Sequence, residues 1–169
     1  TKITFLPSYK EFGYKKFSKK ASTALYKLIE TRMFQTAAFV GANCKIWFDD
    51  TPLEFDECDK SPFHQFAEMF IDNEFGLYST TLVHPDDKKL NIDVCIGISD
   101  GKSRSSSIIN GISVFEGGTH IKHLSNEIVA HILPKMEALL PKDHAKIQPS
   151  VILNNLFIFV KCSIVNPKF

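Results

Sequence analysis

The sequence predicts an α+β fold in which a mostly antiparallel sheet carries helices on one face. Strand-like segments outnumber helical ones after about residue 56, and they follow one another between short polar turns. The 169 residues are 44% apolar and 23% charged, which is enough apolar material for a real core. We expect two domains, residues 1–55 and 56–169, separated at the acidic patch 56–59.

The first residues predict a strand. Residues 1–5 alternate polar and apolar side chains, as expected for a strand buried on one face, and Pro7 ends the run. A chain that starts in mid-strand and stops directly after Asn166-Pro-Lys-Phe169 is expected to be part of a longer protein.

A long helix is predicted over residues 19–39, with Ser18 as its N-cap and Gly41 as its stop. Residues 44–48 then indicate a strand, and an Asp-rich turn leads to a short partner at 53–55.

The second domain begins with a shorter helix. Ser61 and Pro62 supply its N-cap and first helical position, and apolar residues from Phe63 to Ile71 share one face. Three strands are predicted next, separated by Pro-Asp-Asp and Asp-Gly-Lys turns, at residues 77–84, 90–98 and 105–115.

The turn at Gly117 and Gly118 ends the third strand and offers Thr119 as a helix cap. Apolar residues then recur at helical spacing, and Pro134 is expected to kink or end this helix. The apolar run 151–165 predicts a last strand.

Composition excludes several classes of protein. A net charge of +1 creates no global field toward nucleic acid, so any DNA contact must be local. No run approaches the roughly 20 apolar residues of a membrane span, and we expect no membrane partner. The cysteines are widely spaced and are expected to be reduced core thiols: Cys44, Cys58, Cys95 and Cys162.

The Gly101-Lys102-Ser103 string invites comparison with a phosphate-binding loop. That motif needs a glycine at position 96, where the chain has isoleucine, and it should open a helix, whereas a strand is predicted. An ordinary hairpin turn is the better interpretation.

Other candidate sites are incomplete. His120 and His123 have a spacing that could serve a metal, but no carboxylate or cysteine stands in register with them. Exposed or capping histidines are the preferred interpretation, and His120 could form a hydrogen bond near the Gly117-Gly118 turn. The serines at 103–107 lack a nucleophile signature.

The loop before the last strand is locally basic, with Lys135, Lys142, His144 and Lys146 around Pro141. Such a loop can contact a DNA backbone, or it can be a solvated loop diluted by Glu137 and Asp143. Both interpretations remain open.

Three strings resemble eukaryotic-type members of the type IIA DNA topoisomerase family. The chain opens Thr1-Lys-Ile-Thr-Phe-Leu-Pro-Ser-Tyr-Lys-Glu-Phe12, similar to T-x-I-x-F-x-P-D-x-x-x-F with Ser8 at the usual aspartate. Ile108-Ile-Asn-Gly-Ile-Ser113, followed by Gly117-Gly-Thr-His120, resembles S-F-V-N-S-I-x-T-x-x-G-G-T-H. The end, Leu156-Phe-Ile-Phe-Val-Lys-Cys-Ser-Ile-Val-Asn-Pro-Lys-Phe169, resembles F-I-F-V-N-C-L-I-E-N-P-x-F.

The resemblance implies that residues 1–55 close a GHKL-type ATP-binding module and that 56–169 form a transducer domain with a left-handed βαβ crossover. The nucleotide pocket would precede Thr1, and a Gln-Thr-Lys loop would follow Phe169. The implied activity is double-strand DNA passage, with this segment coupling ATP use to dimerisation and DNA capture.

The resemblance also implies ATP and Mg²⁺ as cofactors of the parent, none bound by this segment alone, and a homodimer acting on double-stranded DNA. It places the parent in the nucleus or at a viral replication site. It implies no catalytic residue in this segment. Lys142 and Lys146 are the expected DNA contacts, and the expected turn and helix cap are formed by Gly117, Gly118 and Thr119.

Two rival interpretations remain. A small phosphotransferase with a left-handed βαβ fold would need a complete glycine-rich loop. A non-enzymatic interaction module from a mismatch-repair or chaperone ATPase shares the superfamily, but the terminal Asn166-Pro-Lys-Phe169 string favours a topoisomerase.

Overall fold

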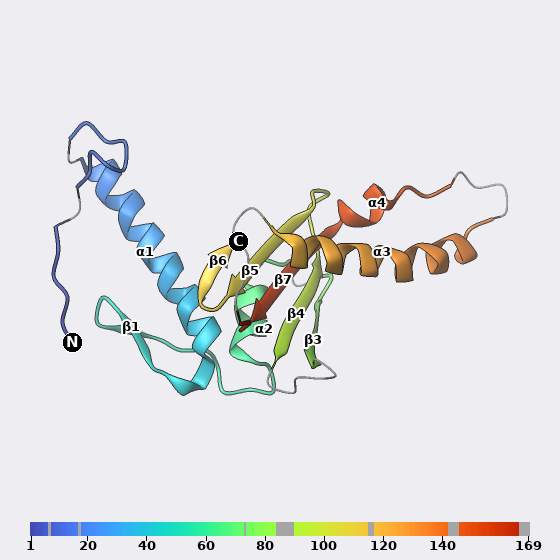
Figure 1. Cartoon of the computed structure of the whole chain (residues 1–169), viewed down its shortest axis with the longest axis horizontal. Coiled ribbons are helices and arrows are strands. Elements are labelled where there is room, and N and C mark those ends of the chain that lie inside the picture. The colour runs from blue at the N-terminus through green and yellow to red at the C-terminus, as the bar shows by residue number, and fades with distance from the viewer. Residues whose placement is uncertain are drawn as a thin grey trace.

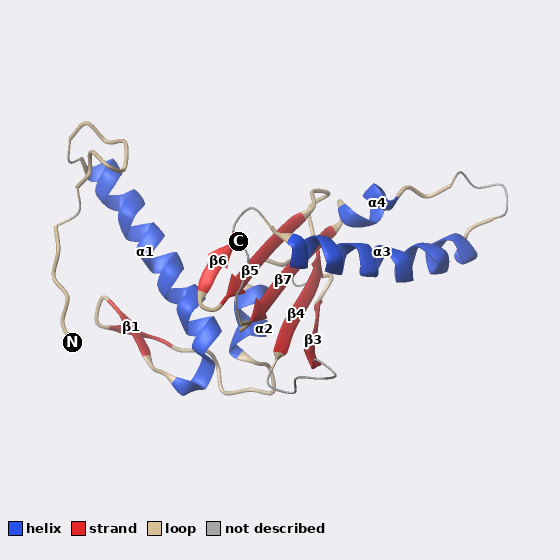
Figure 2. Cartoon of the chain, in the orientation of Figure 1, coloured by secondary structure: helices blue, strands red, loops and turns tan. Residues whose placement is uncertain are grey.

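A computed structural model describes residues 1–6, 8–16, 18–72, 74–83, 90–114, 117–141 and 146–165, and it confirms the α+β class. Its main sheet has five strands in the order β3-β4-β7-β5-β6 (Figures 1 and 2). The strands are β3 (Leu77–Val83), β4 (Asn91–Ile98), β5 (Arg104–Ile109), β6 (Ile112–Val114) and β7 (Leu156–Cys162). Every pair is antiparallel except β5 with β7, which are parallel.

The parallel pair is joined by a crossover of unusual hand. After β5 and its partner β6, the chain passes through α3 (Thr119–Leu139) and α4 (Pro149–Leu153) before it enters β7. In Figure 1, α3 lies in front of the sheet, the parallel strands β5 and β7 run downward, and β7 lies to the right of β5. When the view is turned so that these strands point up, β7 lies to the left of β5. The crossover is therefore left-handed, as the family resemblance implied, whereas parallel crossovers are right-handed in about 98% of cases.

Three strand predictions need correction. The predicted strand 105–115 is folded back on itself at Asn110 and Gly111, whose φ angles of 52° and 79° form the two-residue turn between β5 and β6. Asn-Gly is the preferred sequence for such a turn. The Gly101 loop is not a hairpin turn, because β7 lies between β4 and β5 in the sheet.

The predicted strand 151–165 was also too long. Its first residues belong to α4, which starts with Pro149, and the side chain of Asn155 donates to the carbonyl of Val151 at 2.8 Å. Proline suits the first turn of a helix. A short apolar run does not by itself distinguish a buried strand from a buried helix.

The helix predicted at 19–39 is α1 (Lys19–Val40), and the Ser18 Oγ accepts a hydrogen bond from the Ala21 N–H at 3.2 Å. The hairpin that follows, β1 (Ile46–Phe48) and β2 (Thr51–Leu53), begins its second strand two residues earlier than expected. Asp49 and Asp50 adopt positive φ angles of 51° and 59° in its turn.

Residues 1–5 do not form the predicted strand. They pair with no strand of the described chain, and the side chains of Ile3 and Phe5 are 82% and 75% exposed. A strand needs a hydrogen-bonding neighbour, so the alternating pattern alone does not produce one.

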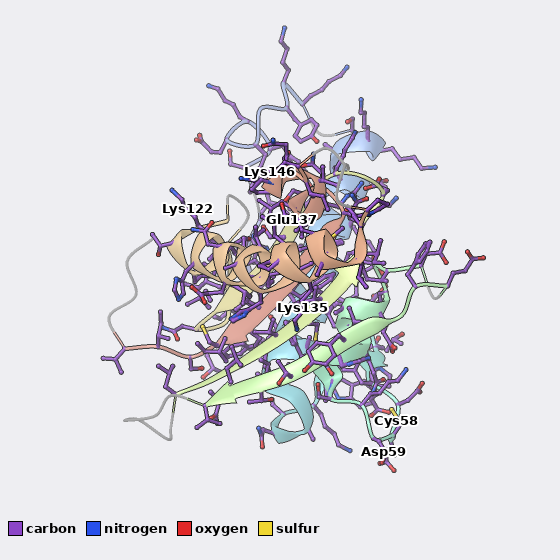
Figure 3. All side chains as sticks on the ribbon, turned by 90° about the vertical axis from the view of Figure 1, so that its right-hand side faces the viewer. Cys58, Asp59, Lys122, Lys135, Glu137 and Lys146 are labelled. Atoms are coloured by element: carbon purple, nitrogen blue, oxygen red, sulfur yellow. The ribbon has the colours of Figure 1, made fainter. Side chains whose placement is uncertain are left out.

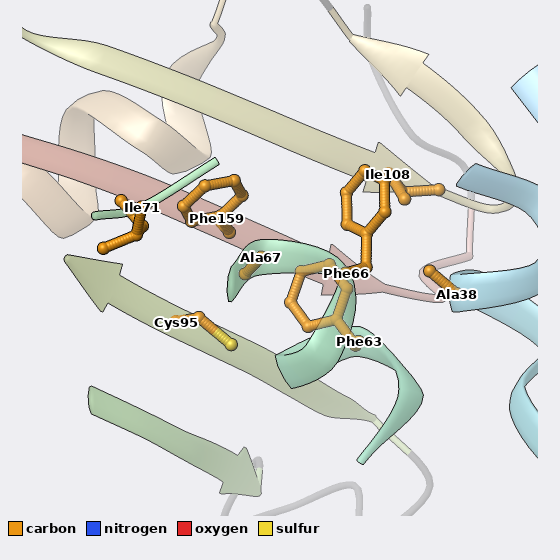
Figure 4. Close-up of a cluster of buried hydrophobic side chains, with 8 residues drawn as sticks. All are labelled: Ala38, Phe63, Phe66, Ala67, Ile71, Cys95, Ile108 and Phe159. Carbon is orange, nitrogen blue, oxygen red and sulfur yellow. The ribbon is translucent and has the colours of Figure 1, made fainter. Parts of the chain in front are cut away.

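The core lies between the sheet and α2 (Pro62–Glu68), whose N-cap is Ser61 as predicted. Phe63, Phe66 and Ala67 of α2 pack on side chains of β4, β5 and β7, joined by Ala38 of α1 (Figure 4). Burying a phenylalanine of this kind stabilises the fold by about 1.5–3 kcal/mol.

The helices were predicted to lie on one face of the sheet, but α2 and α3 lie on opposite faces. Ile108 belongs to the α2 cluster, whereas Ser107, the residue before it on β5, contacts His120 of α3. Successive strand residues point to opposite faces, so α2 and the start of α3 cover opposite sides of the sheet. The short helix α2 cannot cover both faces.

The cysteines divide into two pairs. Cys95 and Cys162 are buried in the sheet, and burial raises the pKa of Cys95 to about 12 and also raises the pKa of Cys162. Cys44 and Cys58 are exposed, so the expectation of core thiols was wrong for these two. All four carry free thiols. Within the described residues, no helix has both the length and the apolar character required to cross a membrane.

Candidate functional site

The turn before α3 depends on two glycines. Gly117 has φ of 79° and Gly118 has φ of 139°, and both values are strained for any other residue. Gly118 is the N-cap, and its carbonyl accepts from the Lys122 N–H at 3.0 Å. Thr119 is the first helical residue, so the predicted Thr119 cap is wrong by one position.

The imidazole of His120 lies where a side chain at position 118 would be placed. A Cβ at Gly118 would lie 2.8 Å from Cε1 of His120, closer than real carbon contacts. The Nε2 atom of His120 lies 3.0 Å from Oγ of Ser107, which is 1% exposed. Burial lowers the pKa of His120. A neutral imidazole thus fastens the first turn of α3 to β5.

Beyond this attachment α3 packs against α4. None of its 21 residues is buried, and its C-terminal half projects past the sheet (Figure 1). Pro134 lies inside the helix and does not end it, contrary to one of the two predicted outcomes. Ala130, whose carbonyl loses a helical donor because of Pro134, is exposed and open to water.

The predicted basic loop lies at this projecting end. Lys142 and His144 lie outside the described residues, whereas Lys135 on α3 and Lys146 before α4 are exposed. In Figure 3, which faces this end of the molecule, Lys146 lies above α3 and Lys135 below it. The two described lysines therefore do not form one stripe along the helix. A DNA contact through Lys142 and Lys146 stays a prediction.

A polar contact joins α1 to the sheet edge. Gln35, only 8% exposed, accepts at Oε1 from the Ser113 Oγ at 2.5 Å and from Nη1 of Arg32 at 3.0 Å. Ser113 belongs to β6, 78 residues away in sequence. Sequence reasoning missed this contact. The available signal was a glutamine among the apolar residues that end the helix.

An ion pair spans the two central antiparallel strands. Nζ of Lys161 lies 2.9 Å from Oδ2 of Asp93, whose Oδ1 accepts from Oγ1 of Thr81 at 2.8 Å. The Lys161 ammonium also lies 5.5 Å from the centre of the Phe63 ring. Both residues of the ion pair line a cavity of about 430 Å³ between the sheet and the end of α1. Because Asp93 neutralises the charge of Lys161, the pair is not suited to bind an anion, and its role is to link β4 and β7.

A second polar cluster ties α2 to the edge strand β3. Nδ1 of His64 lies 2.7 Å from Oγ of Ser79, and Nε2 lies 3.2 Å from Oε1 of Glu68. Lys60 donates to the same carboxylate oxygen at 2.6 Å. The hydrogen bond from Lys60, with a smaller one from His64, lowers the pKa of Glu68. The cluster holds two elements together.

The Gly101 loop leads from β4 into β5, a strand rather than a helix, so its amides are not gathered at a helix N-terminus as in a phosphate loop. Arg104 beside it donates two hydrogen bonds to the Asp100 carboxylate, at 3.1 and 2.7 Å. Among the described residues, no group of three or more His, Cys, Asp and Glu side chains is arranged to hold a metal ion. His123 is exposed.

Comparison with known proteins shows what this arrangement is similar to. The family model described as DNA gyrase B matches residues 57–169. DNA topoisomerase 2 of Meyerozyma guilliermondii is 26% identical over 100% of this chain and 12% of that protein. DNA topoisomerase 2 of Acanthamoeba polyphaga mimivirus is 27% identical over 100% of this chain and 12% of its own length.

Solved structures share the fold. The ATPase region of Saccharomyces cerevisiae topoisomerase II superposes with a TM-score of 0.69 at 21% identity, over 96% of this chain and 37% of that one. The 43K ATPase domain of Thermus thermophilus gyrase B gives a TM-score of 0.60 at 20% identity, over 96% and 44%. The chain thus spans about 12% of the length of the curated relatives named above.

Proposed function

Because the chain belongs to the DNA gyrase B family, we propose that it is a coupling segment of an ATP-dependent type II DNA topoisomerase. The observation that carries the proposal is the match to proteins named DNA topoisomerase 2 over 100% of this chain. The proposed activity is passage of one DNA duplex through another, and this segment links ATP binding and hydrolysis to arm closure and DNA capture.

The geometry supports a mechanical role. The five-stranded sheet is a rigid body with α1 attached through Gln35 and α2 on one side, and with α3 attached through His120 on the other. A rigid sheet passes a rotation at one attachment to the other, because packed cores do not deform continuously. In this role the segment transmits a movement and need not supply catalytic side chains.

ATP and Mg²⁺ are proposed as cofactors of the longer protein, bound elsewhere in it. The Gly101 loop does not fit a nucleotide, because it enters a strand and Arg104 beside it is already paired with Asp100.

The domain division is part of the proposal, with residues 1–55 completing the ATP-binding module and 56–169 forming the transducer. Two observations support it. The family model begins at residue 57. The apolar side chains of the N-terminal segment, including Ile3, Phe5 and Leu6, are largely exposed, as expected where further protein packs.

Double-stranded DNA and a second copy of the longer protein are the proposed partners, with Lys142 and Lys146 on the DNA. The exposure of Lys146 at the projecting end of the molecule supports its role. Relatives from fungi and from a large virus support placement in the nucleus or at a viral replication site.

The decisive experiment uses the longer protein that contains this chain, with supercoiled plasmid and ATP. We expect plasmid relaxation that requires ATP. ATP hydrolysis without relaxation would instead support the alternative, an interaction module of a mismatch-repair or chaperone ATPase.

The lysine assignment is tested separately. Replacing Lys142 and Lys146 with alanine should weaken DNA-stimulated ATP hydrolysis, and Lys27→Ala on the exposed side of α1 serves as the matched control. Two lost phosphate contacts should also reduce the salt dependence of DNA binding by a slope of about 2. If DNA stimulates ATP hydrolysis equally in the variant, the loop is a solvated loop that does not contact DNA.

A further inference from the structure

The side chain of Asn110 binds a segment far from it in sequence. Its Nδ2 donates to the carbonyl oxygen of Ile164 at 2.8 Å, and its Oδ1 accepts from the Ile164 N–H at 2.8 Å. The backbone N–H of Asn110 donates to the carbonyl of Cys162 at 3.0 Å. One residue thus holds the chain at two points, the last residue of β7 and Ile164 just beyond it.

These contacts continue the sheet where the backbone cannot. The parallel ladder between β5 and β7 ends with the pair Ile109 and Cys162, because the chain turns back at Asn110. A side-chain amide presents one carbonyl and N–H donors, the same groups as a peptide unit. Asn110 therefore replaces a further residue of β5 and extends the pairing to Ile164.

The turn does not require these contacts. Asn110 has φ of 52°, a conformation that glycine adopts equally well, and Gly-Gly also suits this kind of turn. The choice of asparagine over glycine matters for the two bonds to Ile164.

The same hairpin is held to α1 on its other side. Ser113 of β6 donates to Gln35, and a Cβ built on Gly111 would lie 3.7 Å from the ring of Phe39. The turn residues Asn110 and Gly111 thus stand between the end of α1 and the segment after β7. In Figure 1, β6 lies on the side of the sheet that faces α1.

We propose that Asn110 is a positioning residue: its side-chain amide makes the β5–β6 hairpin, itself held to α1, fix the path of the chain that leaves β7. The consequence for activity rests on the proposed function. When α1 moves relative to the sheet, the hairpin carries the segment after β7 with it, so the two parts respond together.

The contact itself is tested by hydrogen exchange of the Ile164 amide in the full protein. Asn110→Gly keeps the turn and removes both side-chain bonds, so exchange at Ile164 should rise by at least about fivefold. Asn110→Asp keeps an acceptor for the Ile164 N–H and should leave its exchange closer to the wild-type rate. Asp50→Gly, at positive φ in the β1–β2 turn, is the matched control and should leave Ile164 unchanged.

Two results would overturn the proposal. One is unchanged exchange at Ile164 in Asn110→Gly. The other is an equal rise across β7, which would mean that the substitution only destabilises the sheet.

A measurement of ATP turnover tests the coupling role of Asn110 separately from the proposed function. In the longer protein, Asn110→Gly should lower DNA-stimulated ATP turnover several-fold more than Asp50→Gly does, with KM for ATP unchanged. Equal turnover in the two variants would contradict the coupling role of Asn110. A wild-type protein without DNA-dependent turnover would overturn the proposed function, whereas the exchange result at Ile164 would still decide the contact.

Discussion

Helices α2 and α3 cover opposite faces of one sheet and are held in different ways. The 7-residue α2 buries Phe63, Phe66 and Ala67 completely enough to leave each at most 2% exposed. The 21-residue α3 buries none, and its first turn is fastened by the hydrogen bond between His120 and Ser107. Length therefore does not decide which helix is anchored.

The difference has a physical cause in the side chains. The rings of Phe63 and Phe66 stack on one face of α2. Phe66 makes an edge contact with Phe70, just after the helix, and Phe70 in turn contacts Phe157 and Phe159 of β7. Helix α3 carries smaller aliphatic residues that stay partly exposed, and its end extends beyond the sheet. We infer that α2 belongs to the rigid body, and that α3, which is attached to the sheet at its first turn and packs against α4, is an arm.

The largest expected effect breaks the anchored side. Phe66→Ala should lower the free energy of unfolding by about 3–5 kcal/mol, because it opens a cavity in the core. Ile128→Ala on α3, which is only half-buried, should cost less than about 2 kcal/mol. Urea unfolding curves measure both, and equal losses would contradict the distinction between the helices.

A smaller effect is expected at the attachment of α3. Gly118→Ala meets His120 and a φ of 139°, so it should cost about 1–3 kcal/mol and loosen the first turn. Gly101→Ala also has positive φ, 85°, but meets no atom within 4 Å, and it is the matched control. Chemical denaturation of both variants separates the contact from the backbone strain. A Gly118 variant as stable as the control would show that the imidazole moves freely.

The smallest expected effect is a pH dependence from His120. Burial lowers its pKa in the folded state, so the folded protein binds fewer protons than the unfolded chain, whose histidine titrates near about 6.5. The stability it contributes is present above that value and is lost as pH falls through the lower folded pKa. His120→Gln should flatten stability against pH in this window. An unchanged slope would assign the dependence to other groups.

Local signals predicted much of this fold. Ser18 and Ser61 mark the starts of α1 and α2 because serine caps a helix through a bond to the first turn, and both bonds are present. The Gly117-Gly118 turn was likewise visible, since no other residue suits those backbone angles.

Long-range relations were not predictable in the same way. The insertion of β7 between β4 and β5 depends on a crossover whose hand runs against the general rule, and only the family resemblance implied it. The contact of Gln35 with Ser113 and that of Asn110 with Ile164 join residues 78 and 54 positions apart. No spacing pattern encodes such contacts, because each partner alone fits its local element.

Hydrogen exchange along the two helices tests the central claim most directly, that α2 is part of the rigid sheet body and α3 an arm fastened at its first turn. The account predicts that amides in the second half of α3, beyond Ile128, exchange through local opening, while those of α2 and β7 exchange only when the whole protein unfolds. Equal protection of the end of α3 and of β7 would contradict it.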